Sequence, residues 1–376
     1  MKIIHTSDWH FGMPVGTGSY RECQEYFLQQ LYDLIRTEEA EAVICAGDIY
    51  DSSVTNAEAI GLFNEAARML CAELGVQFIV IAGNHDGAAR LSAHSDLLRG
   101  AGLHISGRLK KEVDPVLLDG GKVAVYPIPF FNREEVTALY PEEKERIRSV
   151  ETAMEVVCDK IRENMDKTRV NLLVSHSLIV DAEISESDRS ARVGFATAIS
   201  KDVFHGFDYV ALGHIHKPQC IAPHVRYSGD PMAYSFGSEE AQEKGVVIYD
   251  TQLKTERFVP LKPMRSRRTV KGTLEEILAM EDIAEDYLRL YVTDRYAGLE
   301  LQAQLRQRFP YLLEVYGKGL TEEQSLSSLS LEELGRLDET DIMEKFLGEH
   351  FDYSPNEDQL ALFRDVLAWS REEDEK

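Results

Sequence analysis

Short apolar runs alternate with stretches of helical periodicity over the first two thirds of the chain. The apolar runs span residues 3–7, 42–46, 78–82, 123–128, 171–175 and 209–212. Three other stretches carry apolar side chains three and four positions apart, as helices do: residues 22–37, 57–74 and 151–165. Runs that are short and continuously apolar are typical of strands buried on both faces of a parallel sheet. The pattern therefore predicts a layered α/β fold.

Two later runs, residues 225–229 and 245–250, favour antiparallel strands of a second sheet. With the first set they predict a two-sheet sandwich flanked by helices. From residue 269 to about residue 317 the pattern indicates strand, helix, strand, helix and strand. Thr273 and Glu276 have the spacing of a capping box at the first of these helices. This part is expected to form a small α/β domain.

The chain is thus divided into three parts, residues 1–263, 269–318 and 320–376. The junction at residues 262–271 holds five basic residues and no acidic one. It is either a solvated linker or an edge that contacts phosphates. The last part is expected to be helical, with Pro355 at the first position of a helix and an apolar stripe behind it. That stripe either folds onto its own body or docks on another protein.

Charge is unevenly distributed along the 376 residues, whose net charge is −24. Residues 320–376 hold 17 acidic and 5 basic residues, so half of the excess negative charge lies there. A chain this acidic is expected to hold DNA weakly by itself and to need a helper. The glycine-rich pattern of a P-loop is absent, so no ATP site of that kind is encoded.

The five cysteines are scattered and form no CxxC pair. An odd, unpatterned set fits reduced thiols in a cytoplasm better than a disulfide framework. The first residues turn polar too early for a signal peptide, and no apolar run is long enough to span a membrane. We therefore expect a cytoplasmic location.

Five of the apolar runs end in side chains that bind metals. Because ligands bind where the strands of such sheets run out at their carboxyl ends, these side chains are expected to converge. The candidate metal shell is Asp8, His10, Asp48, Asn84, His176, His214 and His216.

The shell offers nitrogen and oxygen donors and no thiolate, which suits manganese, iron, zinc or magnesium. Seven ligands are too many for one tetrahedral ion but suit two ions that share a bridge. Asp48 is the expected bridge. One ion is assigned to Asp8, His10 and His216, and the other to Asn84, His176 and His214.

Two such ions clamp a phosphoryl group and share a hydroxide that attacks phosphorus. His85 follows a ligand and is not needed in the shell. It is the candidate general acid or transition-state stabiliser, a role that suits histidine near neutral pH. Asp86 is expected either to orient His85 or to cap the following turn. The shell therefore predicts phosphoester hydrolysis.

The order of these residues resembles the calcineurin-like metallophosphoesterase signature. The motifs are Asp8-x-His10, Gly47-Asp48, Gly83-Asn84-His85-Asp86, His176 and Gly213-His214-x-His216. The stretches around them, residues 5–10, 210–218 and 227–236, are similar to the nuclease subunits of the bacterial SbcCD family. The resemblance implies the metallophosphoesterase sandwich, the metal shell above and a catalytic His85.

The resemblance also implies two divalent metal ions, most often manganese, and a role in DNA repair, recombination and replication. The implied substrates are double-stranded DNA ends and hairpins, cut by exonuclease and endonuclease action. The implied partner is an SbcC-type ATPase in a heterotetramer, with two copies of this subunit pairing as a homodimer. Residues 269–318 would be a capping domain that helps to hold DNA, and residues 320–376 would dock the ATPase.

Two other functions fit parts of the pattern. A calcineurin-like phosphatase or small-molecule phosphodiesterase needs the same metal clamp, but has no use for some 110 further residues that end in a helical tail. A non-catalytic scaffold would be favoured by a lost ligand or a replaced His85, and neither occurs. The pattern therefore favours a DNA nuclease subunit.

Overall fold

The computed structural model describes residues 1–185, 198–296, 298–318, 355, 359–360 and 362–363. The chain divides into two compact units. The first comprises Met1–Val270, Met280–Leu290 and Arg306–Glu314, and the second comprises Lys271–Ala279, Tyr291–Leu305 and Val315–Lys376. Both sheets of the sandwich lie in the first unit.

The first sheet has six strands in the order β14-β13-β1-β4-β5-β6. Their bounds are Thr255–Pro260, Gly245–Asp250, Lys2–Thr6, Ala42–Cys45, Gln77–Ile81 and Leu103–Ser106. Strands β1, β4, β5 and β6 are parallel, whereas β13 and β14 run antiparallel at one edge. The carboxyl ends of three predicted strands therefore meet at one edge of this sheet.

The second sheet has six strands in the order β11-β12-β10-β9-β8-β7. Their bounds are Gln219–Ala222, Val225–Tyr227, Tyr209–Gly213, Val170–His176, Val123–Ile128 and Val116–Leu118. Strands β12, β10, β9 and β8 pair in parallel. The two remaining apolar runs with polar ends thus belong to this sheet.

The prediction that residues 225–229 and 245–250 form antiparallel strands of the second sheet is confirmed in part. Strand β12 lies in the second sheet, antiparallel to β11 but parallel to β10. Strand β13 is antiparallel to its neighbours as predicted, but it joins the first sheet beside β1. Alternation along a strand specifies which face is buried but not which neighbour supplies the hydrogen bonds. The predicted two-sheet sandwich flanked by helices is confirmed.

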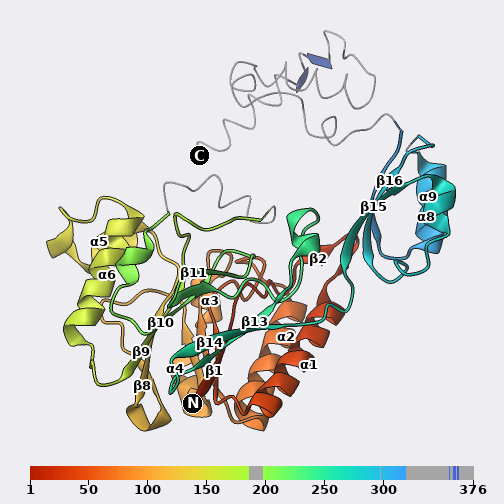
Figure 1. Ribbon diagram of the computed structural model, residues 1–376. Helices are drawn as coiled ribbons and strands as arrows, with labels where there is room; N and C mark the ends of the chain where they lie inside the picture. The colour runs from red at the N-terminus through yellow and green to blue at the C-terminus, as the bar shows by residue number, and fades with distance from the viewer. Residues whose placement is uncertain (186–197, 297, 319–354, 356–358, 361, 364–376) are drawn as a thin grey trace. The chain divides into compact units, whose positions relative to one another are not determined.

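Helices cover the outer face of each sheet (Figure 1). Helices α1 (Arg21–Glu38) and α2 (Ala57–Ala67) pack on the first sheet in one apolar core, and α6 (Val150–Asn164) packs on the second in another. A third core fills the space between the sheets, with Ile44 and Ile79 from the first and Leu172 from the second. Because both faces are covered, the strands are apolar at nearly every position.

The other elements are short. Helix α2 continues as a π-helix, Arg68–Glu73, so the predicted helix at 57–74 changes type near its end. The short helices are α3 (Ala88–Leu91), α4 (Ser95–Leu98) and α5 (Arg133–Leu139). The 3₁₀ turns are Arg99–Ala101, Asp119–Gly121, Pro141–Glu143, Lys201–Phe204 and Ser238–Ala241. Strands β2 (Pro14–Val15) and β3 (Gly18–Ser19) form a two-stranded ribbon.

The predicted order of strand, helix, strand, helix and strand beyond residue 266 is confirmed. The elements are β15 (Arg267–Gly272), α8 (Leu274–Leu278), β16 (Tyr287–Val292), α9 (Leu299–Arg308) and β17 (Leu312–Tyr316). The strands form a three-stranded sheet in the order β15-β16-β17. Thr273 and Glu276 make the predicted capping box.

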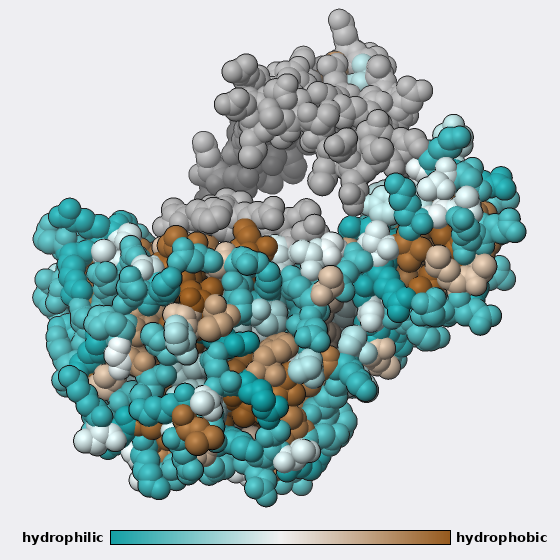
Figure 2. Space-filling view, viewed as in Figure 1, coloured by the Kyte–Doolittle hydropathy of each residue, from teal (hydrophilic) through white to brown (hydrophobic). Residues whose placement is uncertain are grey.

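The predicted tail helices at residues 320–376 lie almost wholly outside the described residues. Among the residues that are described, no helix has the length and apolarity needed to cross a membrane. The visible surface of the described part is largely hydrophilic, with apolar residues in separate patches (Figure 2).

Candidate metal centre

The seven predicted metal ligands follow strands of both sheets. Asp8 and His10 follow β1, Asp48 follows β4, and Asn84 follows β5, all in the first sheet. His176 is the last residue of β9, and His214 and His216 follow β10, both in the second sheet. The cluster therefore forms at the edge where the carboxyl ends of the two sheets come together.

The backbone at this edge is unusual. Asp8, His10, Asp48 and His214 all have positive φ angles, of 54°, 45°, 50° and 101°. Residues other than glycine seldom adopt this conformation, and such departures gather at functional sites. The conformation turns each chain sharply at the strand end, so that consecutive ligands can point into one cluster.

Two glycines allow the loops to approach one another. Gly47 has a φ of 97°, and a β-carbon there would lie 2.3 Å from Nδ1 of His176. At Gly83 a β-carbon would lie 2.1 Å from a carboxylate oxygen of Asp48. Any larger residue at either position would displace a predicted ligand.

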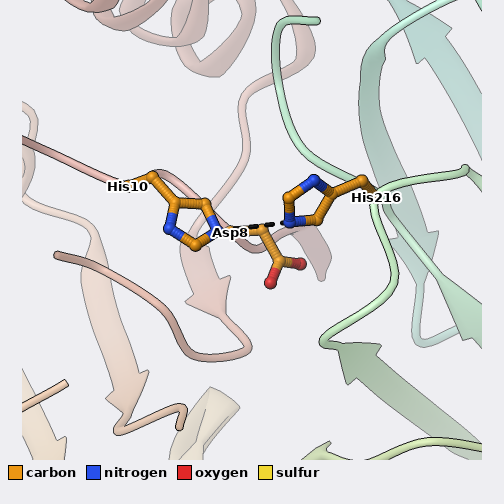
Figure 3. Close-up of side chains that lie close together, drawn as sticks. All are labelled: Asp8, His10 and His216. Carbon is orange, nitrogen blue, oxygen red and sulfur yellow. Dashed lines mark hydrogen bonds between the residues drawn. The ribbon is translucent and has the colours of Figure 1, made fainter. Parts of the chain in front are cut away.

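Asp8, His10 and His216 form the first group (Figure 3). All three are buried, and their ligand atoms lie within 4.8 Å of one another. Nε2 of His10 lies 3.2 Å from Nε2 of His216, so two imidazole nitrogens face each other across the group. Asp8 also accepts hydrogen bonds from the backbone N–H of His214, at 3.1 and 3.2 Å. The three side chains that the sequence analysis assigned to one ion therefore lie together.

Asn84, His176 and His214 form the second group. The Asn84 side-chain oxygen lies 3.0 Å from Nε2 of His176 and 2.9 Å from Nδ1 of His214. Nδ1 of His176 donates a hydrogen bond to the carbonyl of Ala46, at 2.8 Å. That bond directs Nε2 toward the cluster, as hydrogen bonds to the far ring nitrogen do in metal sites.

Asp48 lies between the two groups. Its Oδ2 is 3.9 Å from Nε2 of His10 and 3.3 Å from Nε2 of His176. One carboxylate oxygen therefore faces a histidine of each group, which is the arrangement that a bridging ligand requires.

The electrostatics of the cluster favour a cation. Burial alone would lower the pKa of His176, but the negative charges of Asp48 and Asp8 and a hydrogen bond to Asp48 raise it to about 9. Burial opposes ionisation of Asp48, yet the charge of His176 outweighs it and lowers the pKa of Asp48. Burial lowers the pKa of His214 to about 3 and that of His216 well below its usual value, so both are neutral imidazoles, the form that binds metals.

His85 lies beside the cluster and is held at two points. Its backbone N–H donates to Oδ1 of Asp48 at 2.8 Å, and its Nδ1 donates to the backbone carbonyl of Asp51 at 2.8 Å. Its ring lies edge-on to that of His10, with centroids 4.9 Å apart. Nε2 is thus the ring nitrogen left to give or take a proton.

Asp86 holds backbone groups that precede it in the chain, so it neither orients the His85 ring nor caps the following turn, the two roles predicted for it. Its carboxylate accepts hydrogen bonds from the backbone N–H groups of Ile49, Tyr50 and Gly83 at 3.2, 2.9 and 2.9 Å. Burial raises the pKa of Asp86 to about 6. The group that contacts the His85 ring nitrogen is instead the carbonyl of Asp51.

Sequence reasoning missed the side chains behind the ligands. Oδ1 of Asp51 lies 3.5 Å from Nδ1 of His10, and Oδ2 of Asp230 lies 3.4 Å from Nδ1 of His216. Glu239 and Lys244 lie beside Asp230. Asp51 follows a predicted ligand by three positions, but nothing in the pattern connects Asp230, Glu239 or Lys244 to the strand ends.

The donors fit a pair of divalent ions. The facing nitrogens of His10 and His216 and the buried carboxylate of Asp8 each offer a lone pair when deprotonated, so a divalent cation between them would be bound by all three. Three carboxamide or carboxylate side chains and four imidazoles form two groups joined at Asp48. The fold and this centre define a metallophosphoesterase.

The chain belongs to the calcineurin-like phosphoesterase family, whose sequence profile, described as "Calcineurin-like phosphoesterase", matches residues 1–218. A second profile, described as "Type 5 capsule protein repressor C-terminal domain", matches residues 260–351. The family match implies divalent metal binding and agrees with the candidate ligand groups.

Two relatives match nearly the whole length of this chain and indicate which members of the family it resembles. A Staphylococcus epidermidis protein, named as the SbcD component of the nuclease SbcCD, is 31% identical over 98% of this chain and 98% of its own length. A protein of the same name from Staphylococcus saprophyticus is 30% identical over 93% of this chain and 94% of its own length. A crystal structure of a Thermus thermophilus protein is 12% identical over 69% of this chain and 99% of its own, with a TM-score of 0.40. That score is low, and the assignment does not depend on it.

Proposed function

We propose that this chain is the nuclease subunit of an SbcCD-type complex and hydrolyses phosphodiester bonds of DNA. The observation that carries the proposal is the convergence of the seven donors with His85 beside them. Similarity over nearly the whole chain to two proteins named as SbcCD nuclease components supports it. The substrates are double-stranded DNA ends and hairpins, cut by exonuclease and endonuclease action.

Seven side chains would hold two divalent ions. Asp8, His10 and His216 would bind one ion, and Asn84, His176 and His214 the other, with Asp48 in contact with both. When bound, such a pair supplies Lewis-acid activation of the phosphodiester and of the attacking water. The cluster offers oxygen and nitrogen ligands, which suits manganese, the ion we propose.

His85 acts at the leaving oxygen of the phosphodiester, where a proton is needed. Since Nδ1 donates to the Asp51 carbonyl, the ring is held in one orientation and Nε2 is the atom that transfers the proton. The backbone bond from His85 to Asp48 ties this ring to the central carboxylate of the metal centre. His85 therefore acts as general acid or stabilises the charge that develops in the transition state.

The remaining parts are assigned by the same proposal. Residues 1–263 form the nuclease domain, residues 269–318 a capping domain that helps to hold DNA, and residues 320–376 the element that docks an SbcC-type ATPase. Two copies of this subunit form a homodimer within the heterotetramer with the ATPase. The complex acts in the cytoplasm. A partner is also required by the net charge of −24, which opposes tight binding to DNA by the chain alone.

The test is cleavage of a DNA hairpin by the purified full chain with Mn²⁺, with and without its co-purified ATPase and ATP. We expect cleavage that depends on the metal, is stimulated by the partner and ATP, and is lost in His85→Gln. An enzyme that hydrolyses p-nitrophenyl phosphate or mononucleotides well and leaves DNA intact under every condition would instead be a phosphatase or small-molecule phosphodiesterase.

A further inference from the structure

A second group of charged side chains lies buried behind His216. Asp230 and Glu239 are 0% and 1% exposed, and Lys244 is 6% exposed. Burying an unpaired charge is expensive, so a buried lysine beside two buried carboxylates is expected to offset part of their negative charge. None of the three is a ligand in the metal centre proposed above. We call Asp230, Glu239 and Lys244 the His216 anchor.

Lys244 lies at the centre of the anchor. Its Nζ is 2.6 Å from Oδ1 of Asp230 and 3.4 Å from Oε2 of Glu239. The same Nζ donates a hydrogen bond to the backbone carbonyl of His216, at 3.0 Å. One ammonium group therefore lies against two buried carboxylates, offsets part of their negative charge and holds the backbone of a predicted metal ligand.

Asp230 contacts the ring of that ligand. Its Oδ2 lies 3.4 Å from Nδ1 of His216, while Nε2 of the same ring faces His10. A carboxylate at one ring nitrogen favours the tautomer protonated there and leaves the other nitrogen free for a metal. The anchor thus holds both the main chain and the ring of His216.

Glu239 ties the anchor to the surrounding loop. Its carboxylate accepts hydrogen bonds from the backbone N–H of Tyr234, at 2.9 Å, and from the hydroxyl of Ser235, at 2.7 Å. The ring of Tyr234 lies edge-on to that of His10, with centroids 5.7 Å apart. The chain after β12 is therefore fixed against the first ligand group at two places.

His216, Asp230 and Glu239 could themselves hold a metal ion, because their ligand atoms all lie within 4.8 Å of one another. Lys244 already supplies a positive charge to both carboxylates. The positive charge of Lys244 opposes the entry of a metal ion at this position, where Nδ1 of His216 lies beside Asp230, whereas Nε2 faces His10 in the first ligand group.

We propose that Asp230 and Lys244 are positioning residues that set the metal affinity of the ion bound by Asp8, His10 and His216. Asp230 holds the His216 ring with Nε2 directed at the ion, and Lys244 keeps Asp230 in place. This inference rests on the metal centre of the proposed function and does not depend on the identity of the substrate.

The test compares Mn²⁺ binding to the metal-free full chain by calorimetry in the wild type, Asp230→Asn and Lys244→Met. We expect one of two binding steps to weaken about 10- to 100-fold in each variant, as for other groups that orient metal-binding histidines. The second step, at Asn84, His176 and His214, should be unchanged. Histidine ¹⁵N spectra of the metal-free wild type should show His216 protonated at Nδ1, and those of Asp230→Asn a mixture of tautomers.

Arg226→Met is the matched control. Arg226 pairs with Glu256 at 2.8 Å, and both side chains are mostly buried, at 17% and 16% exposure, but neither belongs to the anchor. This variant should bind both ions as the wild type does. An equal loss in Arg226→Met would show a general effect of removing a buried cation and would overturn the inference.

The inference is also overturned if Asp230→Asn binds both ions with wild-type affinity and keeps the wild-type histidine spectrum. Asp230→Asn serves this purpose even if Lys244→Met fails to fold, since it keeps the side chain's size and removes only its charge. A wild type that binds two ions but leaves DNA intact would contradict the proposed nuclease activity while leaving this inference standing.

Discussion

Buried carboxylates lie on both sides of the His216 ring, and their negative charge is offset in different ways on the two sides. Asp8 and Asp48 lie among histidines on the Nε2 side. Asp230 and Glu239 lie on the Nδ1 side, with the ammonium group of Lys244 between them. The first group presents ligands that can exchange a proton for a metal ion, whereas the second carries its own permanent cation.

This difference indicates that the side chains on the Nε2 side bind the metal ion, whereas those on the Nδ1 side hold His216 in place. On the Nε2 side the carboxylates raise the pKa of His176 to about 9, so this side attracts a positive charge that it does not contain permanently. On the Nδ1 side burial opposes the charge of Lys244, but Asp230 and Glu239 outweigh it and raise the pKa of Lys244. A metal ion should therefore enter the first group and leave the second unchanged.

The largest effect is expected from Asp48→Asn. This change removes the negative charge that faces both His10 and His176, so both binding steps should weaken by more than about 100-fold, beyond the range for supporting groups. Calorimetry with Mn²⁺ measures the affinities. Asp33→Asn, at an exposed carboxylate paired with Arg36, should change nothing. Tight binding of two ions by Asp48→Asn would show that Asp48 is not the bridge.

His85→Gln should lower the rate of DNA cleavage by about 10²- to 10⁴-fold, the usual contribution of a proton-transfer group. Metal content should stay at the wild-type level, because His85 is not needed as a ligand. The matched control is His205→Gln, since Nδ1 of His205 also donates to a backbone carbonyl, that of Asp202, at 3.0 Å. Loss of metal together with activity in His85→Gln would place this residue among the ligands instead.

Lys244→Met should lower the free energy of unfolding of the metal-free chain by about 3–5 kcal/mol, since it leaves two carboxylates buried without their cation. Lys254 offers a matched pair, because its Nζ is also 2.6 Å from a carboxylate, that of Asp208, but is 56% exposed. Lys254→Met should cost no more than about 1 kcal/mol. Denaturant unfolding in EDTA measures both, and equal losses would refute the contrast between the two lysines.

Loss of a single bound ion should destabilise the wild type by a smaller amount. At a metal concentration 100 times the Kd, each bound ion adds about 2.7 kcal/mol to the free energy of unfolding, provided that it does not bind the unfolded chain. Thermal unfolding with Mn²⁺ and with EDTA should therefore show a higher Tm with metal. The shift should be absent in Asp48→Asn, and a shift of the same size there would place the stabilising ions elsewhere.

The smallest effect is expected at a partly buried carboxylate, Glu38, whose side chain is 20% exposed. Hydrogen bonds from Lys2 and Arg257 lower its pKa below the usual 4.5. Its contribution to stability is therefore present above pH 4.5 and is lost as the pH falls through the lower folded-state value. Glu38→Gln should lower stability near pH 7 by no more than about 1 kcal/mol and leave stability at low pH unchanged, which slightly flattens the acid limb of a stability–pH curve. A large loss near neutral pH would contradict this.

The convergence of the candidate ligands could be predicted from the sequence because each part of its signal is local. An apolar run predicts a strand, and the residues that end it must lie at the edge of a sheet. Asp48 and His176 are visible in this way although 128 positions separate them. The prediction did not require that β4 and β9 be assigned to different sheets, since both strands end at the same edge.

The remaining features depend on tertiary contacts that no local pattern encodes. Strand β13 has the composition of an ordinary strand, and nothing in its sequence specifies that it pairs with β1. Lys244 precedes that strand and resembles any lysine near a strand end. Only folding brings it against Asp230 and Glu239. The motif around Asp230 carries a family resemblance, but its contact with His216 could not be deduced from spacing.

The origin of the ligands in two separate sheets has one more consequence. Neighbouring residues along a strand are about 3.3 Å apart, so a slip of one sheet against the other by a single residue would move His176 and His214 out of reach of Asp48. Each bound ion would therefore link the two sheets through its ligands. Loss of the ions should be the first measurable sign that packing between the sheets has loosened. Metal release during gradual denaturation would therefore measure the integrity of that core before either sheet unravels.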